Sequence, residues 1–313
     1  MPTISWLRVL SDPKAELGAP DGPGLGVMLH RRALSRCQNG RRRERYGQCS
    51  YQSRETVTSS QRLKGKVAVI TGATSGFGEA IARVFATEGA ALVLGGRRVG
   101  AGEALSAELR SLGADVQFVA GDVGNERDAD ALVACARGAH GRIDVLVLNA
   151  GIGYPGTGPF WEVPPQEFDL VFGTNVRGVW LCARAAAPLL GRGASVVVMA
   201  SMSSFVVYPG ETVYSASKGA VLQLARGMAG DLAPRGIRVN ALCPGICDTP
   251  LTRWFIDNAD DPTGTEAEFA AFAPLERMGR ADEIARATLF LATEDSSYCT
   301  GSSLLIDGGA TIR

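Results

Sequence analysis

Two side chains capable of proton chemistry, Tyr214 and Lys218, lie four residues apart in the sequence. On a helix, this spacing places both side chains on one face. A free tyrosine has a pKa of about 10, too high for proton exchange at neutral pH, and a neighbouring ammonium favours the phenolate. The pair is therefore suited to general acid–base chemistry, although Tyr-x-x-x-Lys by itself is also the pattern of a simple surface pair.

A serine thirteen residues before Tyr214 adds a hydroxyl to this pair. Ser201 directly follows the apolar run 195–200, which predicts a buried strand. In a parallel sheet, Ser201 would lie at the carboxyl edge, where ligands bind. Ser203 and Ser204 lie close by, so the choice of Ser201 rests on its spacing to the tyrosine.

A glycine-rich loop follows the first predicted strand, 66–71, and opens a predicted helix over 76–88. Glycines let the backbone turn tightly and bring its N–H groups close to a pyrophosphate at the positive end of a helix. The sequence therefore predicts a dinucleotide site, with contacts from Gly72, Thr74, Ser75, Gly76, Phe77 and Gly78.

The end of the second predicted strand, 91–94, indicates which dinucleotide binds. NAD sites carry an acidic residue here, which holds the ribose 2′-hydroxyl. This sequence instead reads Gly95-Gly96-Arg97-Arg98, and two guanidiniums can pair with a phosphate. We therefore favour NADP(H), with NAD(H) as the alternative; arginines that simply face solvent are the competing interpretation.

From residue 63 onward, short β-branched runs alternate with longer amphipathic segments. This alternation predicts an α/β fold, a Rossmann-type doubly wound parallel sheet of about seven strands flanked by helices, in a single domain over 63–313. The expected strands are 66–71, 91–94, 116–120, 145–148, 195–200, 239–242 and 303–306. The expected helices are 76–88, 102–112, 126–139, 166–190 and 213–232.

Residues 1–62 lack sustained apolar periodicity and carry several prolines, glycines and arginines. We interpret them as a basic, largely disordered N-terminal extension. A targeting peptide, a nucleic-acid-binding arm and a dispensable extension are the competing interpretations. Acidic residues near the start argue against the first, and one short arginine cluster is weak support for the second, so we favour the third.

The composition argues against several classes of function. The 313 residues are 46% hydrophobic and 20% charged with a formal net charge of zero, which is typical of a soluble globular protein. We expect no nucleic-acid partner, no membrane association and a cytoplasmic location. The seven cysteines include no Cys-x-x-Cys pair and there are two histidines, so no metal site is predicted.

The order of these motifs resembles that of the short-chain dehydrogenase/reductase family, from about residue 63 to the end. The resemblance implies a Rossmann fold and hydride transfer between a nicotinamide cofactor and a carbonyl or alcohol carbon. The sequence departs from the family pattern at Leu148 and Cys247. The matching positions are the glycine loop from Thr71 to Gly78, Asp122, Asn149-Ala150-Gly151, Asn175, Ser201, Tyr214, Lys218, Pro244, Gly245 and Thr249.

The resemblance also implies a role for each residue. Tyr214 would exchange a proton with the substrate oxygen, and Ser201 would position that oxygen. Lys218 would lower the tyrosine pKa and bind the nicotinamide ribose, and Asn175 would hold a water in a proton relay. Thr249 would contact the carboxamide. Further cofactor contacts would come from Asp122, Val123, Asn149, Ala150, Gly151, Pro244, Gly245 and Cys247.

The segment 250–279 corresponds to the family's substrate lid. Its aromatic residues Trp254, Phe255, Phe269 and Phe272 suit a moderately hydrophobic ketone or alcohol, or serve only to pack the lid down. Arg192 and Arg235 lie at positions that carrier-protein-dependent ketoacyl reductases use for docking, so a 3-oxoacyl-thioester reductase is one alternative function. A non-catalytic cofactor sensor is another, although such proteins typically lose the tyrosine or the lysine.

Family members usually assemble as tetramers through two long helices and the final strand. We therefore expect a homotetramer (or a dimer) formed through 166–190, 213–232 and the last strand. These helices carry more apolar residues than one buried face requires.

Overall fold

The computed structural model describes residues 61–153 and 159–312, so the predicted N-terminal extension lies almost wholly outside the described residues. Its last residue, Arg62, packs onto the domain. The Arg62 backbone N–H donates to Glu88 Oε2 at 3.0 Å, and its guanidinium pairs with Glu88 Oε1 at 3.0 Å. Within these ranges, no helix combines the length and the apolar character needed to cross a membrane.

Seven parallel strands form the central sheet, in the order β3-β2-β1-β4-β5-β6-β9. The chain builds outward from β1 in one direction and then from β4 in the other, which confirms the predicted doubly wound sheet. Its carboxyl edge at the β1–β4 reversal is where such folds bind ligands. The strands are β1 Val67–Thr71, β2 Ala91–Gly96, β3 Val116–Ala120, β4 Ile143–Leu148, β5 Leu190–Met199, β6 Arg238–Pro244 and β9 Ser303–Ile306.

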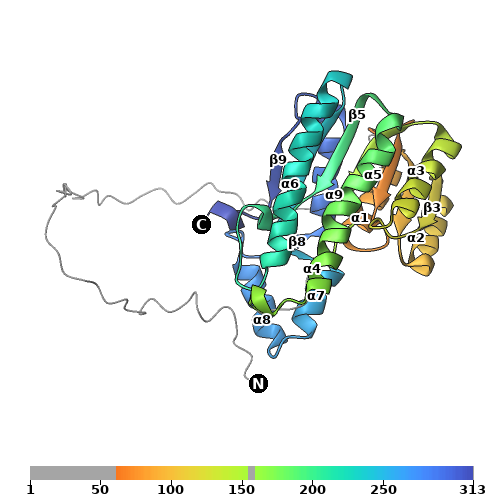
Figure 1. The fold of residues 1–313 in the computed structure, drawn as a ribbon. Coiled ribbons are helices and arrows are strands. Elements are labelled where there is room, and N and C mark those ends of the chain that lie inside the picture. The colour runs from red at the N-terminus through yellow and green to blue at the C-terminus, as the bar shows by residue number, and fades with distance from the viewer. Residues whose placement is uncertain (1–60, 154–158, 313) are drawn as a thin grey trace, which may run out of the picture. The chain divides into compact units, whose positions relative to one another are not determined.

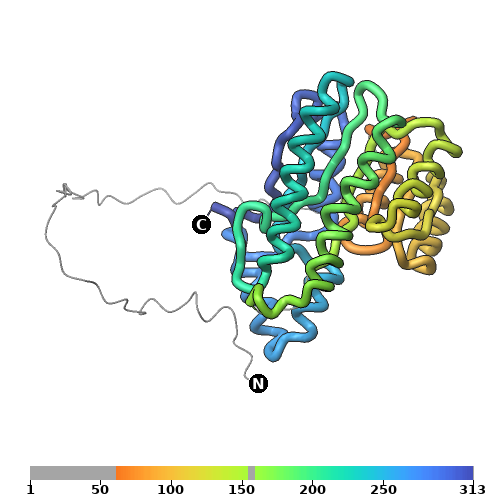
Figure 2. Tube along the Cα trace, in the orientation of Figure 1, coloured from red at the N-terminus to blue at the C-terminus, as the bar shows by residue number. Residues whose placement is uncertain are grey.

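Helices cover both faces of the sheet (Figure 1). One face packs against α3, α5 and α6, and the other against α1, α2 and α9. Figure 2 shows the consequence of the winding: the chain from orange to yellow occupies one side of the domain, and the chain from teal to blue the other. The helices are α1 Gly76–Thr87, α2 Val99–Ser111, α3 Glu126–His140, α4 Pro165–Phe172, α5 Gly178–Ala186, α6 Thr212–Leu232 and α9 Ala281–Ala292.

Alternation along each strand divides the core into two clusters. In β1, Val69 packs into the cluster beneath α3, α5 and α6, whereas Ala68 and Ile70 pack into the cluster beneath α1, α2 and α9. Successive side chains of a strand point to opposite faces, and a sheet buried on both faces needs apolar residues at each position. All five residues of β1 are buried for this reason.

The prediction of a single long helix over 166–190 is wrong in two respects. A π-helical turn, Gly173–Arg177, separates α4 from α5, and residues 187–189 form a 3₁₀ turn. The strand β5 then begins at Leu190, five residues before the predicted start at Ser195. Its first residues, 191–193, are exposed, so they carry no apolar signal from which a strand could be read.

The segment after β6 forms a small subdomain beyond the carboxyl ends of the strands (Figure 1). It contains the helices α7 Pro250–Asp257 and α8 Pro262–Ala271 and the two-stranded pair of β7 Cys247–Asp248 with β8 Gly279–Arg280. Arg253 joins these parts. Its guanidinium bonds both carboxylate oxygens of Asp248, at 2.7 and 2.9 Å, and Glu266 Oε1 at 2.7 Å. We call residues 250–279 the lid.

Candidate active site

The glycine loop after β1 is held against the loop after β4 by hydrogen bonds. Thr71 Oγ1 accepts from the backbone N–H groups of Asn149 and Ala150, at 2.9 and 3.0 Å. Asn149 Nδ2 in turn donates to the carbonyl oxygens of Thr71 and Gly72, at 3.0 and 3.2 Å. The predicted Asn149-Ala-Gly motif therefore helps to fix the shape of the glycine loop.

The glycine loop and the N-terminus of α1 form a cradle whose close backbone packing leaves no room for side chains. A Cβ on Gly78 would lie 2.1 Å from the Gly72 carbonyl oxygen, and one on Gly72 would lie 2.8 Å from Ala150 Cα. Gly72 also has a φ of +66°, which favours glycine. At the N-terminus of α1, Ser75 makes no side-chain capping bond, so the first N–H groups of the helix are open to an anion. The residues present therefore fit a dinucleotide pyrophosphate.

The two predicted phosphate-binding arginines directly follow β2, and Arg98 reaches the glycine loop. Arg98 donates to the Thr74 carbonyl oxygen at 2.8 Å, which brings its guanidinium over the glycine loop. Arg97 Nη1 lies 3.8 Å from Asp122 Oδ2, and both of these side chains are exposed. Asp122 Oδ1 also accepts from the Gly124 N–H at 2.9 Å, so Asp122 shapes its own turn. Both arginines can reorient toward a ligand because their present bonds are few and exposed.

The residues predicted to handle the proton meet at the same edge of the sheet. Lys218 and Ser201 are buried, whereas Tyr214 is half-buried. The Lys218 ammonium lies 5.8 Å from the centroid of the Tyr214 ring and donates to the Met199 carbonyl oxygen at 3.0 Å. A Cβ on Gly151 would lie 3.3 Å from Lys218 Nζ, which places the lysine beside the loop after β4.

The structure separates the three neighbouring serines. The Ser201 side chain interacts with the Tyr214 hydroxyl and lowers its pKa. Ser203 Oγ instead donates to Glu211 Oε2 at 3.4 Å, and Ser204 Oγ donates to the Lys218 carbonyl oxygen at 2.8 Å. The geometry therefore supports the assignment of Ser201 that spacing alone suggested.

Asn175 lies in the π-helical turn and is buried. Its side chain bonds both backbone groups of Ile152: Oδ1 accepts from the N–H at 2.8 Å and Nδ2 donates to the carbonyl at 2.9 Å. Nδ2 also donates to Ser217 Oγ at 3.0 Å, on the helix that carries Tyr214. Asn175 therefore joins the loop after β4 to α6, and its role in a water relay stays a prediction. Short π-helical insertions are frequent at functional sites.

Burial controls the ionisation of the pair. It raises the pKa of Tyr214 to about 12, against a hydrogen bond from Ser201 that lowers it, while the charge of Glu211 raises it further. Burial also lowers the pKa of Lys218 to about 8. The expected depression of the tyrosine pKa by the lysine is thus not seen in the protein alone, because desolvation opposes the charged form of both groups. At neutral pH, Tyr214 is a protonated phenol able to donate.

The lysine makes stability depend on pH. In the folded protein its pKa is about 8, against 10.5 for the unfolded chain, so the unfolded state binds more protons between these values. The free energy of unfolding contributed by Lys218 therefore rises with pH, by roughly 2 kcal/mol from pH 8 to pH 10. Urea titrations should show this rise in the wild type and its loss in Lys218→Met. Equal pH dependence of the two proteins would contradict the burial of a titrating lysine.

The remaining predicted cofactor contacts divide into two kinds. Thr249 lies beside the glycine loop, since a Cβ on Gly76 would be 3.8 Å from the Thr249 Cβ. Gly245 follows Pro244 at the end of β6, and a Cβ there would lie 2.7 Å from Asp307 Cα. The other kind packs within the protein. Val123 would meet a Cβ on Gly178 at 2.7 Å, and Cys247 Sγ one on Gly279 at 2.7 Å.

Cys247 is buried, and burial raises the pKa of its thiol to about 12. The thiol is therefore neutral at physiological pH and is not an activated nucleophile. The packing of Cys247 against Gly279 explains why a small residue occupies position 247. A contact between Cys247 and the cofactor stays a prediction.

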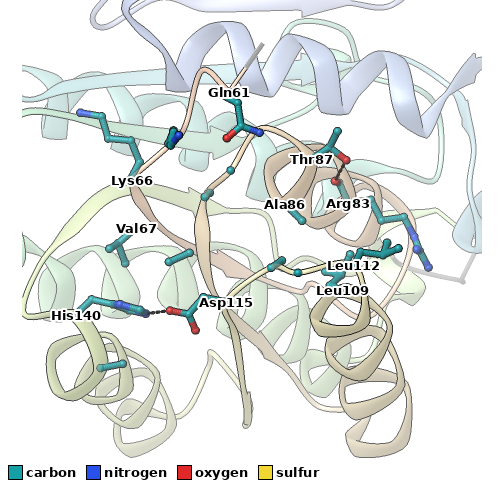
Figure 3. Close-up of a pocket in the computed structure, with 18 of the residues that line it drawn as sticks. Gln61, Lys66, Val67, Arg83, Ala86, Thr87, Leu109, Leu112, Asp115 and His140 are labelled. Carbon is teal, nitrogen blue, oxygen red and sulfur yellow. Dashed lines mark hydrogen bonds and ion pairs between the residues drawn. The ribbon is translucent and has the colours of Figure 1, made fainter. Parts of the chain in front are cut away.

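A separate cavity of about 970 Å³ lies at the amino-terminal end of the sheet, opposite the end that carries Tyr214 (Figure 3). It is lined by residues at the amino ends of the strands, among them Val67, Ala91 and Asp115. Figure 3 shows His140 pointing toward Asp115, with His140 Nε2 4.0 Å from Asp115 Oδ2. Ligands of doubly wound sheets bind at the carboxyl ends, so this cavity does not belong to the site of Tyr214.

Comparison with known proteins decides the family. A family model described as "Enoyl-(Acyl carrier protein) reductase" matches residues 72–311. A structure of a short-chain type dehydrogenase/reductase from Mycobacterium marinum superposes with a TM-score of 0.74 at 35% identity, covering 81% of this chain and 98% of that one. This chain belongs to the short-chain dehydrogenase/reductase family. It is accordingly an NAD(P)-dependent oxidoreductase acting on CH–OH and C=O groups.

Relatives of this short-chain dehydrogenase/reductase have diverse names. The 2-(R)-hydroxypropyl-CoM dehydrogenase of Xanthobacter autotrophicus is 41% identical over 252 residues, 79% of this chain and 98% of that protein. The glucose 1-dehydrogenase of Gluconobacter oxydans is 40% identical over 255 residues, 80% of this chain and 94% of that protein. A short chain dehydrogenase from Burkholderia cenocepacia, in complex with NADP, has a TM-score of 0.73 and 31% identity, covering 80% of this chain and 99% of that one.

One residue of the site was missed in the sequence. Glu211 precedes Tyr214 by three positions and interacts electrostatically with it. The same helical spacing that pairs Tyr214 with Lys218 also places position 211 next to the tyrosine, so the signal was present. Its significance depends on burial, which the local sequence does not report.

Proposed function

We propose that this enzyme interconverts a ketone and a secondary alcohol with Tyr214 as general acid and base, and that it uses NADP(H). The observation that carries this proposal is that Ser201 and Tyr214 meet beside the buried Lys218, whose ammonium lies 5.8 Å from the centroid of the Tyr214 ring, at the carboxyl edge of the sheet. These two hydroxyls suit a single substrate oxygen, which Ser201 would orient and Tyr214 would protonate.

The glycine loop and the N-terminus of α1 would hold the pyrophosphate, and Gly151 and Lys218 would lie beside the nicotinamide ribose. The bound cofactor supplies or accepts the hydride. The chain itself manages orientation and the proton. In reduction Tyr214 donates its phenolic proton to the carbonyl oxygen and becomes a phenolate. In oxidation the phenolate form of Tyr214 accepts the alcohol proton. Asn175 keeps α6 in register with the loop after β4 through Ser217 and Ile152.

The preference for NADP(H) rests on Arg97 and Arg98. Both directly follow β2, where Arg98 bonds Thr74 of the glycine loop and Arg97 lies beside Asp122. The strand end itself, Gly95-Gly96, carries no acidic side chain to repel a phosphate. The solved relative from Burkholderia cenocepacia carries NADP. We expect wild-type kcat/KM to be higher with NADPH than with NADH.

Replacing both arginines with alanine should raise the KM for NADPH by about tenfold to a hundredfold, since hydrogen bonds to charged groups contribute roughly 1.5–3 kcal/mol. The KM for NADH should change little, because NADH lacks the phosphate. Steady-state assays with both cofactors measure the two values. Arg137→Ala, an exposed position on α3, is the matched control. A wild type that prefers NADH tenfold or more would overturn the preference.

The lid favours a substrate with an apolar body. The rings of Trp254 and Phe255 meet edge to face at 5.2 Å, and Trp254 remains 47% exposed. An exposed aromatic side chain on a segment beside the site is available for contact with a ligand. A moderately hydrophobic ketone is the substrate class we propose. A panel of aryl and alkyl ketones, assayed with NADPH by loss of its absorbance, examines this class directly.

Nothing in the geometry favours the narrower alternative of a carrier-protein-dependent ketoacyl reductase. Arg235 donates to the carbonyl oxygens of Ala187 and Leu190, at 2.9 and 2.7 Å, and Arg192 packs against Gly236. These residues lie around the amino ends of β5 and β6, away from Tyr214. Both arginines have structural partners, so a docking role is not needed to explain them.

We also propose the homotetramer (or dimer) expected from the family. Apolar side chains of α4 and α5 support it: Phe168, Leu170 and Trp180 are 45%, 49% and 46% exposed. The strand β9 ends the sheet and leaves one edge unpaired within the described residues. A second copy of the chain would cover both features.

A further inference from the structure

Glu211 is the residue immediately before α6, and its carboxylate does not cap that helix. The helix has no side-chain capping bond at this position. Instead, Ser203 Oγ donates to Glu211 Oε2 at 3.4 Å. The carboxylate is thereby directed to the loop that carries Ser201, whose Oγ accepts from the Ser203 N–H at 3.1 Å. The usual structural role of an acidic residue at a helix start does not account for Glu211.

The charge of Glu211 reaches the hydroxyls on both sides of it. It raises the pKa of Tyr214 and the pKa of Tyr208, in each case in addition to a larger effect of burial. The Tyr208 ring packs edge to face against Phe272, with 5.1 Å between the centroids, where α8 ends in the lid. The Glu211 backbone N–H also donates to the Tyr208 carbonyl oxygen at 3.0 Å. Glu211 therefore connects the loop that carries Ser201 with the base of the lid, beside the position that a ketone bound at Ser201 and Tyr214 would occupy.

Within 61–153 and 159–312, no cation pairs with Glu211. The ammonium of Lys218 donates to the Met199 carbonyl oxygen instead. Glu211 is half-buried, and burial raises the pKa of its carboxyl against the opposing bond from Ser203. A half-buried acceptor repels an anion strongly and binds a hydrogen-bond donor well, because little solvent screens either interaction.

We propose that Glu211 determines substrate specificity by accepting a hydrogen bond from a hydroxyl or ammonium group on the carbon next to the reacting carbonyl, and by excluding substrates with a carboxylate there. The inference deepens the proposed function and rests on it, because it places the reacting carbonyl at Ser201 and Tyr214. A hydroxyl and an ammonium group can both donate a hydrogen bond to the Glu211 carboxylate. Only the ammonium carries a positive charge that the carboxylate would also stabilise.

Four ketones with one aryl body distinguish these substituents: α-hydroxyacetophenone, α-aminoacetophenone, propiophenone and phenylglyoxylate. The kcat/KM of each with NADPH is measured for the full-length wild type, Glu211→Gln and Glu211→Ala. Glu103→Gln, an exposed position on α2, is the matched control. The wild type should prefer a donor-bearing ketone over propiophenone, and propiophenone over phenylglyoxylate.

Glu211→Gln should raise kcat/KM for phenylglyoxylate about tenfold, since removing a like charge relieves a repulsion. If the recognised donor is an ammonium, Glu211→Gln should lower kcat/KM for α-aminoacetophenone by a similar factor. If it is a hydroxyl, Glu211→Ala but not Glu211→Gln should lower kcat/KM for α-hydroxyacetophenone. Each change is expressed as a ratio to the kcat/KM of the same variant with propiophenone, which separates specificity from a general change in Tyr214 acidity or a loss of structure.

The role of Glu211 would be overturned if the kcat/KM values of the other three ketones, relative to propiophenone, were the same in the wild type and both variants. The proposed function would remain intact in that case, because propiophenone is still reduced. A wild type that reduces none of the four would also overturn it for this substrate class. The proposed function fails by a different result, namely when no carbonyl compound accepts a hydride from the bound cofactor.

Discussion

Tyr214→Phe is expected to lower kcat about 10³-fold with little change in cofactor binding, since a positioned general acid contributes roughly 10²–10⁴-fold. Phenylalanine keeps the ring that fills the half-buried position and removes only the hydroxyl that interacts with Ser201. Steady-state assays give kcat, and fluorescence titration with NADPH gives the dissociation constant.

Tyr298→Phe is the control for this change, because Tyr298 is fully exposed and bonds no residue of the site. It should leave kcat unchanged. A Tyr214→Phe enzyme with a kcat within threefold of the wild type would remove the tyrosine from the proton transfer. The remaining hydroxyl of Ser201 would then be the donor to examine.

Gly78→Ala is expected to have the second-largest effect, and it acts on the cofactor cradle. The new Cβ would lie 2.1 Å from the Gly72 carbonyl oxygen and 2.6 Å from Asn149 Nδ2, so the backbone of the loop must move. Overpacking of this kind costs about 1–3 kcal/mol of unfolding free energy. Because the displaced atoms shape the cradle, the dissociation constant for NADPH should also rise by about tenfold or more.

Gly100→Ala provides a matched control for the addition of one methyl group. Gly100 lies on the exposed side of α2, and a Cβ there meets nothing within 4 Å. Alanine in a helix is favoured over glycine by roughly 1 kcal/mol, so this variant should be as stable as the wild type or more so. Urea midpoints measure both effects. Equal midpoints and equal NADPH affinity for Gly78→Ala and the wild type would contradict the close approach of the two loops.

Much of the site could be predicted because it depends on local spacing. The glycine loop lies between a strand and a helix, and Lys218 follows Tyr214 by one helical turn. Both relations follow from the periodicity of regular elements. The order of the strands could be predicted as well, because repeated strand–helix units form parallel sheets with few available topologies.

The parts that could not be predicted depend on contacts between distant segments. The π-helical turn at Asn175 leaves the periodicity of the helix nearly unchanged. The Asn175 side chain nevertheless bonds Ile152, 23 residues away. The choice among three serines required knowing which hydroxyl faces Tyr214. The direction of the tyrosine pKa required its burial, and a neighbouring lysine in the sequence suggested the opposite direction.

The central claim is that a hydride passes between a bound nicotinamide and a substrate carbon while Tyr214 supplies the proton. The most direct measurement uses NADPH carrying deuterium at both hydrogen positions of nicotinamide C4, with a reducible ketone and the full-length enzyme. Mass spectrometry of the product should find one deuterium on the carbinol carbon, and Tyr214→Phe should lower the rate of its appearance about 10³-fold. An alcohol product without deuterium, or equal rates for the two proteins, would contradict the claim.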